Sequence, residues 1–173
     1  MVLNINNKFN ITLCGLMGSG KSAVGKNLAD KLDYDFIDVD KIIEIHAKKT
    51  IKKIFEEDGE AYFRELEEKI TINKLVNKKT IISLGGGAIM NKNIRKSIKK
   101  NSYNIYLKVD INILAKRLQN SKTRPLIYKK NIKNELITLI DKREKFYQNA
   151  DLVIENEKNL IETIDNIIKK ILN

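Results

Sequence analysis

Short apolar runs alternate along the chain with longer segments of helical periodicity. The runs are rich in β-branched residues, which predicts five strands, at residues 9–14, 35–39, 80–84, 103–109 and 151–155. Between them, apolar residues recur every three or four positions. This spacing predicts helices at 21–32, 60–76, 132–148 and 159–172, two short helices within 40–58, one helix capped by Asn91 and one that runs to Leu118. The alternation predicts an α/β fold, a five-stranded parallel sheet with helices on both faces.

Residues 120–131 interrupt this alternation. The segment is polar, lacks periodicity and holds the single proline of the chain, Pro125. A loop of this length inside a compact domain is usually functional or mobile. Neither a repeat nor a linker divides the sequence, so we expect one domain over residues 1–173.

Six of the eight glycines follow two of the predicted strands, at positions 15, 18, 20 and 85–87. Glycine lets the backbone approach a ligand closely. In parallel sheets, ligands bind beyond the carboxyl ends of the strands. The two glycine-rich strand ends are therefore expected to form one crevice.

Residues 15–22 read GLMGSGKS and match the phosphate-loop pattern G-x-x-x-x-G-K-[ST], with a strand before it and a helix after it. In such a loop, backbone N–H groups and the helix start cradle phosphates. Lys21 is expected to reach the β- and γ-phosphates of a nucleotide and Ser22 to ligate Mg²⁺. The alternative is a glycine-rich turn without a ligand. The predicted nucleotide-binding residues of this segment are Gly15, Gly18, Ser19, Gly20, Lys21, Ser22 and Ala23.

Two carboxylates, Asp38 and Asp40, end the second predicted strand. Residues two apart point to the same side of a strand, so both are expected to face the crevice. One can hold Mg²⁺, directly or through water, and the other can orient and deprotonate a substrate hydroxyl. The alternative for Asp40 is helix capping, a common role of aspartate.

Composition narrows the class of protein. The chain holds 33 Lys and Arg against 22 Asp and Glu, a net charge of +11. The lysines are spread evenly and aromatic residues make up only 6%, which favours a solvated lysine surface over a nucleic-acid site. One cysteine and one histidine exclude a disulfide framework and a cysteine-based zinc site. Without an apolar run of membrane-spanning length or a signal-peptide core, we expect a cytoplasmic protein and no membrane partner.

Arginine is scarce, so its positions are informative: five of the 33 basic residues are arginine. Its planar guanidinium binds carboxylate and phosphate through two hydrogen bonds, which lysine cannot do. Arg143 shares a helix face with apolar residues, so it should point inward toward an anion, with Glu67 as the alternative partner. Arg64 lies at helical spacing from Glu60 and Glu67, and an exposed salt bridge explains it equally well.

The motifs in order resemble those of the shikimate kinases. After the phosphate loop come Asp38-Val-Asp40, Phe63-Arg64-x-x-Glu67, Leu84-Gly85-Gly86-Gly87, Arg124-Pro125-Leu126 and Arg143-x-x-x-Tyr147. The resemblance spans about residues 9–165. It implies a three-layer P-loop kinase fold with a helical substrate-binding insertion at about residues 39–67 and a mobile lid at about 119–132.

The resemblance also implies roles for single residues. Asp40 contacts the shikimate hydroxyls and is the candidate base, while Asp38 supports Mg²⁺ through water. Arg64 and Arg143 clamp the shikimate carboxylate, and the lid residue Arg124 closes over the phosphates. The remaining implied contacts are the backbone N–H groups of Gly85, Gly86 and Gly87 with substrate, and Arg117 with adenine.

The implied activity is transfer of the γ-phosphoryl group of MgATP to the 3-hydroxyl of shikimate, giving shikimate 3-phosphate and ADP. Lys21, Asp40 and Arg124 would be the catalytic residues, and we expect a monomer. Two alternatives stay open. One is another small-molecule kinase, of gluconate or nucleoside monophosphates, which would not need the triple glycine together with Arg64 and Arg143. The other is a non-catalytic nucleotide-binding module.

Overall fold

The computed structural model describes residues 5, 8–119, 131–157 and 159–172. Within them, five parallel strands form one sheet in the order β2-β3-β1-β4-β5. Their bounds are β1 (Asn10–Cys14), β2 (Asp35–Asp38), β3 (Thr80–Ser83), β4 (Ser102–Lys108) and β5 (Leu152–Glu155). The predicted α/β fold with a parallel sheet is confirmed.

Helices connect successive strands, and α8 follows the last strand. They are α1 (Lys21–Leu32), α2 (Val39–Ala47), α3 (Ile51–Lys53), the π-helix η1 (Ile54–Asp58), α4 (Gly59–Leu75), the 3₁₀ helix η2 (Ala88–Met90), α5 (Lys92–Asn101), α6 (Ile111–Leu118), α7 (Ile132–Tyr147) and α8 (Leu160–Leu172). Asn91 caps α5 as predicted, because its side chain accepts the N–H groups of Asn93 and Ile94 at 2.8 and 3.1 Å. Across the described residues, no helix has both the length and the hydropathy to cross a membrane.

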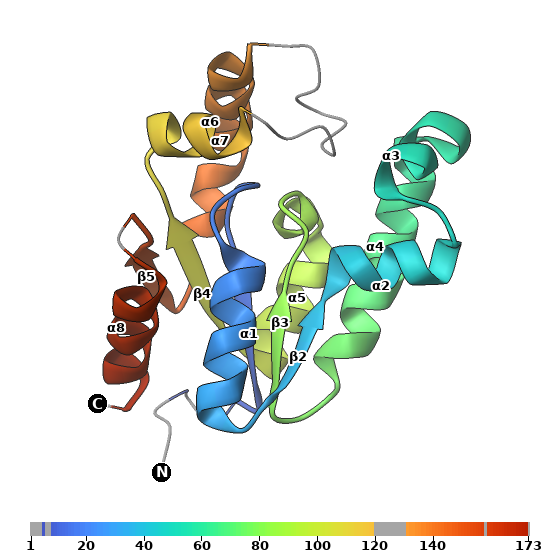
Figure 1. Ribbon diagram of the computed structural model, residues 1–173. Coiled ribbons are helices and arrows are strands. Elements are labelled where there is room, and N and C mark those ends of the chain that lie inside the picture. Colours follow the sequence, from blue (N-terminus) through green and yellow to red (C-terminus); the bar gives the residue numbers. More distant parts are fainter. Residues whose placement is uncertain (1–4, 6–7, 120–130, 158, 173) are drawn as a thin grey trace.

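Helices cover both faces of the sheet (Figure 1). Two apolar clusters of buried side chains hold these layers together. One cluster contains Leu28 of α1, Ile167 of α8 and Ile11 of β1. The other cluster contains residues of α4, α5, α6 and α7, with Ile94 of α5 and Leu136 of α7 fully buried. Each face of the sheet is thus covered, which is the three-layer arrangement that was predicted.

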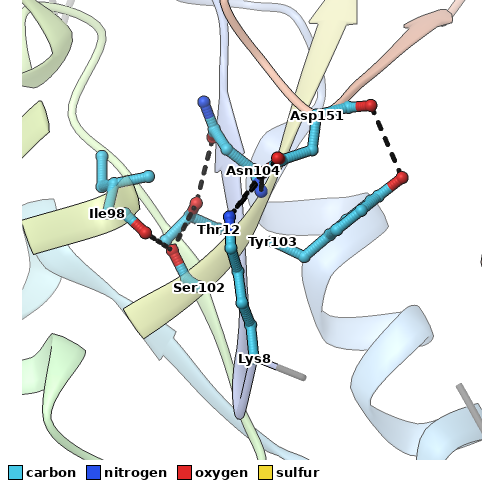
Figure 2. A network of polar contacts seen from close by, with 7 residues as sticks. All are labelled: Lys8, Thr12, Ile98, Ser102, Tyr103, Asn104 and Asp151. Carbon is cyan, nitrogen blue, oxygen red and sulfur yellow. Dashed lines mark hydrogen bonds and ion pairs between the residues drawn. The ribbon is translucent and has the colours of Figure 1, made fainter. Parts of the chain in front are cut away.

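A polar network lies buried between β1, β4 and α5 (Figure 2). The Thr12 hydroxyl donates to Asn104 Oδ1 at 3.0 Å and lies 3.1 Å from the Ser102 hydroxyl, which donates to the Ile98 carbonyl. The network continues to Asp151, whose carboxylate accepts the backbone N–H of Asn104 at 2.8 Å. Because the side chains of Thr12, Ser102 and Asn104 find polar partners here, the sheet can bury them.

The segment between β2 and α4 forms a helical arm on one side of the sheet, made of α2, α3 and η1 (Figure 1). Glu44 of α2 accepts the backbone N–H of Ile51 at 2.9 Å, and Thr50 caps α3 through the N–H of Lys53. These bonds fold the arm back on itself. Phe55 of η1 packs against Phe63 of α4 with ring centroids 4.9 Å apart, which ties the arm to the long helix.

Candidate active site

The phosphate-loop motif lies between β1 and α1, at the carboxyl edge of the sheet. Gly20 is the N-cap of α1 with φ of +90°, so it adopts a left-handed conformation and supplies no capping side chain. A Cβ at Gly15 would lie 2.7 Å from the Leu107 carbonyl, so only glycine fits there. A helix start of this kind directs backbone N–H groups and a positive dipole end at an anion.

Lys21 and Ser22 are the first two residues of α1. The Lys21 ammonium donates to the carbonyls of Gly15 and Leu16 at 2.9 and 3.0 Å, so it folds across the loop. The Ser22 hydroxyl donates to Asp38 Oδ2 at 2.5 Å. This bond joins the phosphate loop to the end of β2, which is where the sequence places the pair of aspartates.

The prediction that both aspartates lie on one strand is wrong, because only Asp38 belongs to a strand. The strand β2 ends at Asp38, and Asp38 is the N-cap of α2 through the N–H of Lys41 at 3.4 Å. Asp40 therefore lies in the first turn of the helix. The alternative role of Asp40 was helix capping, but the N-cap residue of α2 is Asp38. Both carboxylates nevertheless line the same pocket.

That pocket has a volume of about 430 Å³, which is in the range of small-molecule sites. The arm, α4, α7 and the two glycine-rich strand ends enclose it. Its lining consists of Met17, Ser22, Asp38, Asp40, Lys41, Glu44, Ile51, Phe55, Phe63, Arg64, Glu67, Gly85, Gly86, Gly87 and Arg143. The structure thus brings the predicted metal and acceptor residues together in one cavity.

Arg64 is held in the pocket by two carboxylates of its own helix. It contacts Glu67 at 2.7 Å and Glu60 at 3.1 Å. The side chain of Glu60 is 57% exposed, whereas that of Glu67 is 2% exposed. The alternative of an exposed salt bridge therefore applies only to the contact between Arg64 and Glu60. The shorter contact, with Glu67, is buried beside the cavity.

Glu67 is a site residue that the sequence analysis considered only as a partner for arginine. Burial raises the pKa of its carboxyl, the charge of Arg64 opposes this shift and that of Asp40 adds to it. Within the described part of the chain, its Oε1 is buried without a hydrogen-bond partner. A buried acceptor of this kind suits a ligand hydroxyl or a water molecule. The signal in the sequence that could have identified Glu67 was its i, i+3 spacing from Arg64 on one helix.

Arg143 points inward, as its apolar helix face predicts, and is 6% exposed. Its Nη1 donates to the Gly86 carbonyl at 3.0 Å, and the Tyr147 hydroxyl donates to the same oxygen at 2.6 Å. The alternative partner, Glu67, lies near enough for the Arg143 charge to lower its pKa, although burial is the largest effect and raises it. Helix α7 thus fixes both the guanidinium and the glycine segment.

The three consecutive glycines make room for the charged side chains around them. A Cβ at Gly85 would collide with Glu67 Oε1 and lie 2.9 Å from Asp40 Oδ1. At Gly87 it would lie 2.7 and 2.9 Å from the two terminal nitrogens of Arg64. Their backbone contacts with substrate stay a prediction, but all three glycines line the pocket.

Gly87→Ala is expected to displace Arg64 without unfolding the protein. The φ of Gly87 is −99°, which alanine adopts readily, so the collision with the guanidinium is the main effect. We expect the KM for the acceptor to rise by about tenfold, since a charge-assisted hydrogen bond is worth about that factor. Gly86→Ala is the comparison, because its Cβ would meet atoms only at 3.5 Å and beyond. Steady-state kinetics with equal effects in both variants would contradict this account.

The nucleotide side of the site is described in part. Arg117 of α6 donates to the Gly18 carbonyl at 3.3 Å and to the Asn156 carbonyl at 3.2 Å, so its guanidinium lies against the phosphate loop. Ala23 lies in the first turn of α1 and is exposed. Arg124 and nearly all of the predicted lid at 119–132 lie outside the described residues.

Comparisons with known proteins agree with this geometry. The family model for shikimate kinase matches residues 17–173. A shikimate kinase of Sulfurihydrogenibium sp. is 42% identical over 164 residues, 94% of this chain and 95% of the relative. One of Bartonella henselae is 38% identical over 162 residues, 93% of this chain and 77% of the relative.

Solved structures give the same result. A shikimate kinase from Acinetobacter baumannii in complex with shikimate is 32% identical, with a TM-score of 0.92 and coverage of 96% of this chain and 94% of that one. A gluconokinase from Sinorhizobium meliloti has a TM-score of 0.61 over 95% of this chain and 93% of its own, but is only 17% identical and shows the fold alone. The chain belongs to the shikimate kinase family.

Proposed function

We propose that this protein transfers the γ-phosphoryl group of ATP to the 3-hydroxyl of shikimate, giving shikimate 3-phosphate and ADP. The observation that carries the proposal is a single pocket that holds two arginines, Arg64 and Arg143, together with Ser22 and Asp38 of the phosphate side. An acceptor with a carboxylate and a hydroxyl can therefore span from the guanidinium pair to the phosphate loop. The proposed acceptor region is about residues 39–67, the arm and the start of α4.

Acceptor binding follows from the charges in the pocket. Arg64 and Arg143 supply planar guanidinium groups for a carboxylate, and both line the same cavity as Asp40. Glu67 neutralises part of the charge of Arg64 and fixes its orientation at 2.7 Å. The acceptor hydroxyls would then lie beside Asp40, which can accept a hydrogen bond and align the reacting oxygen.

Phosphoryl transfer mainly requires positioning and charge neutralisation. The start of α1 and the Lys21 ammonium would hold the phosphates in line with the acceptor hydroxyl. Asp40 would take the hydroxyl proton as the new bond to phosphorus forms and the bond to the ADP oxygen breaks. Arg124 is proposed to balance the charge that develops on the phosphates, and the segment at about 119–132 to exclude water from the reacting group. We propose that the enzyme acts as a monomer.

The residues where α1 begins and β2 ends fit Mg²⁺. A hydroxyl and a carboxylate, Ser22 and Asp38, lie 2.5 Å apart, and oxygen ligands are those that Mg²⁺ prefers. Across the described residues, three or more His, Cys, Asp or Glu side chains do not gather into a metal cage. In kinase sites, Mg²⁺ is usually held by one or two protein oxygens and the substrate phosphates. Bound there, Mg²⁺ would neutralise charge on the β- and γ-phosphates.

The test is an acceptor panel with coupled detection of ADP release. We expect release with shikimate and none above background with gluconate or a nucleoside monophosphate. Release with gluconate alone would identify a different small-molecule kinase. Nucleotide binding without turnover on any acceptor would identify a non-catalytic nucleotide-binding module.

Arg143→Lys is expected to weaken acceptor binding selectively. The charge stays, but the forked pair of donors is lost, along with the bond from Nη1 to Gly86. We expect the dissociation constant of shikimate to rise by about tenfold and that of ATP to stay within about twofold. Isothermal titration with each ligand measures this. If ATP binding weakens while shikimate binding holds, Arg143 belongs to the nucleotide site.

A further inference from the structure

Asn156 follows β5 and lies at the same edge of the sheet as the phosphate loop. It is 5% exposed, and its backbone N–H donates to the Lys108 carbonyl at the end of β4, at 2.8 Å. None of the sequence motifs includes it. Such burial is unusual for an asparagine in a connecting segment. Both the NH₂ group and the oxygen of the side-chain amide therefore need hydrogen-bond partners.

The side chain of Asn156 is held at both ends. Its Nδ2 donates to the Ser19 carbonyl at 2.6 Å, and its Oδ1 accepts from the Thr163 hydroxyl at 2.7 Å. A carbonyl can only accept, so the NH₂ group must face Ser19. Thr163, in the first turn of α8 and 3% exposed, holds the amide in that orientation.

This contact fixes one peptide plane of the phosphate loop. In a trans peptide, the C=O and the following N–H point in opposite directions. Because the Ser19 carbonyl is tied to Asn156, the Gly20 N–H is directed away from Asn156. A Cβ at Gly20 would lie 2.7 Å from Asn156 Nδ2, so the approach itself depends on glycine.

A second contact supports the first. The Asn156 carbonyl accepts from Arg117 at 3.2 Å, and the same guanidinium donates to the Gly18 carbonyl at 3.3 Å. Two successive carbonyls of the loop are therefore held. Asn156 binds that of Ser19, and Arg117, which is bound to Asn156, binds that of Gly18.

We propose that Asn156 is a positioning residue that orients the Ser19–Gly20 peptide, so that the Gly20 N–H is aimed at a nucleotide phosphate. The inference rests on the proposed function, because it concerns how that reaction's nucleotide is bound. In this role Asn156 would hold the loop and not the substrate. It acts through the backbone of the phosphate loop, and its loss should weaken nucleotide binding while leaving acceptor binding unchanged.

The experiment is isothermal titration of Asn156→Ala with MgADP and, separately, with shikimate. We expect the dissociation constant of MgADP to rise by about tenfold, the value of one misaligned hydrogen bond to a charged group, with that of shikimate within about twofold of the wild type. Wild-type MgADP affinity in Asn156→Ala would overturn the proposal. Failure of the wild-type protein to bind MgADP would instead contradict the proposed function.

Asn10→Ala is the matched control. Asn10 is also a buried asparagine, and its amide donates to the carbonyls of Leu75 and Asn77 at 3.0 and 2.5 Å, at the far end of β1. Both variants should melt at lower temperature, but only Asn156→Ala should weaken MgADP binding. Equal weakening in the two variants would show general destabilisation and overturn the proposal.

Thr163→Val covers the case in which Asn156→Ala does not fold. Valine keeps the shape of threonine but cannot orient the Asn156 amide. We expect the dissociation constant of MgADP to rise by about threefold, because the amide keeps its bond to Ser19 but is less well aligned. Wild-type affinity in a folded Thr163→Val protein would count against the positioning role and overturn it.

Discussion

Replacing Lys21 by methionine is expected to lower the turnover of phosphoryl transfer by at least about 100-fold, since a charge contact to the transition state is usually worth that much. The ammonium lies against the carbonyls of Gly15 and Leu16, within the loop that would hold the phosphates. Methionine keeps most of the length of the side chain and removes the charge. The core should be unaffected, because Lys21 is only half-buried and belongs to neither apolar cluster.

A coupled assay of ADP release and a thermal melt measure the two halves of this prediction. Lys26→Met is the control, because Lys26 is an exposed lysine of the same helix, α1. We expect Lys26→Met to keep wild-type turnover and both variants to melt within a few degrees of the wild type. Retention of more than about a tenth of the activity in Lys21→Met would refute the assigned role, because it is far above the residual expected.

The sheet could be predicted from sequence because its signals are local. Each strand is a short β-branched run and each helix has apolar residues at helical spacing, so element type follows from near neighbours. The phosphate loop was equally predictable, since its glycines, Lys21 and Ser22 act within eight residues. Arg143 was found by the same means, as a charged residue on an apolar helix face that the structure buries.

The sequence did not predict features that depend on contacts between residues far apart in the chain. Asp38 and Asp40 can both cap a helix, and the choice depends on where pairing of β2 with β3 stops, at Asp38 opposite Ser83. The buried polar positions of β1 and β4, such as Thr12 and Asn104, read in sequence only as strand residues. Their hydroxyl and amide groups are acceptable in the core because they meet across the two strands. Asn156 was missed for the same reason, because its partner Ser19 is far away in sequence.

Asp40→Asn is expected to separate binding from chemistry. The amide keeps the size of the carboxylate but cannot take a proton, so we expect turnover to fall by roughly 100-fold or more if Asp40 both aligns and deprotonates the hydroxyl. Shikimate binding should weaken only modestly, because a charge-assisted hydrogen bond is about twice as strong as a neutral one. MgATP should still bind, because Lys21 and Ser22 are unchanged.

Asp38→Asn is the matched variant and should behave differently. Asparagine caps helices as well as aspartate, so the bond to the N–H of Lys41 can persist and α2 should form. What is lost is the negative charge beside Ser22, on the side proposed for the metal. Its defect should therefore be partly rescued by raising the Mg²⁺ concentration, whereas that of Asp40→Asn should not. Titration of both variants against Mg²⁺ and shikimate decides the assignment, and rescue of Asp40→Asn by metal would reverse the two roles.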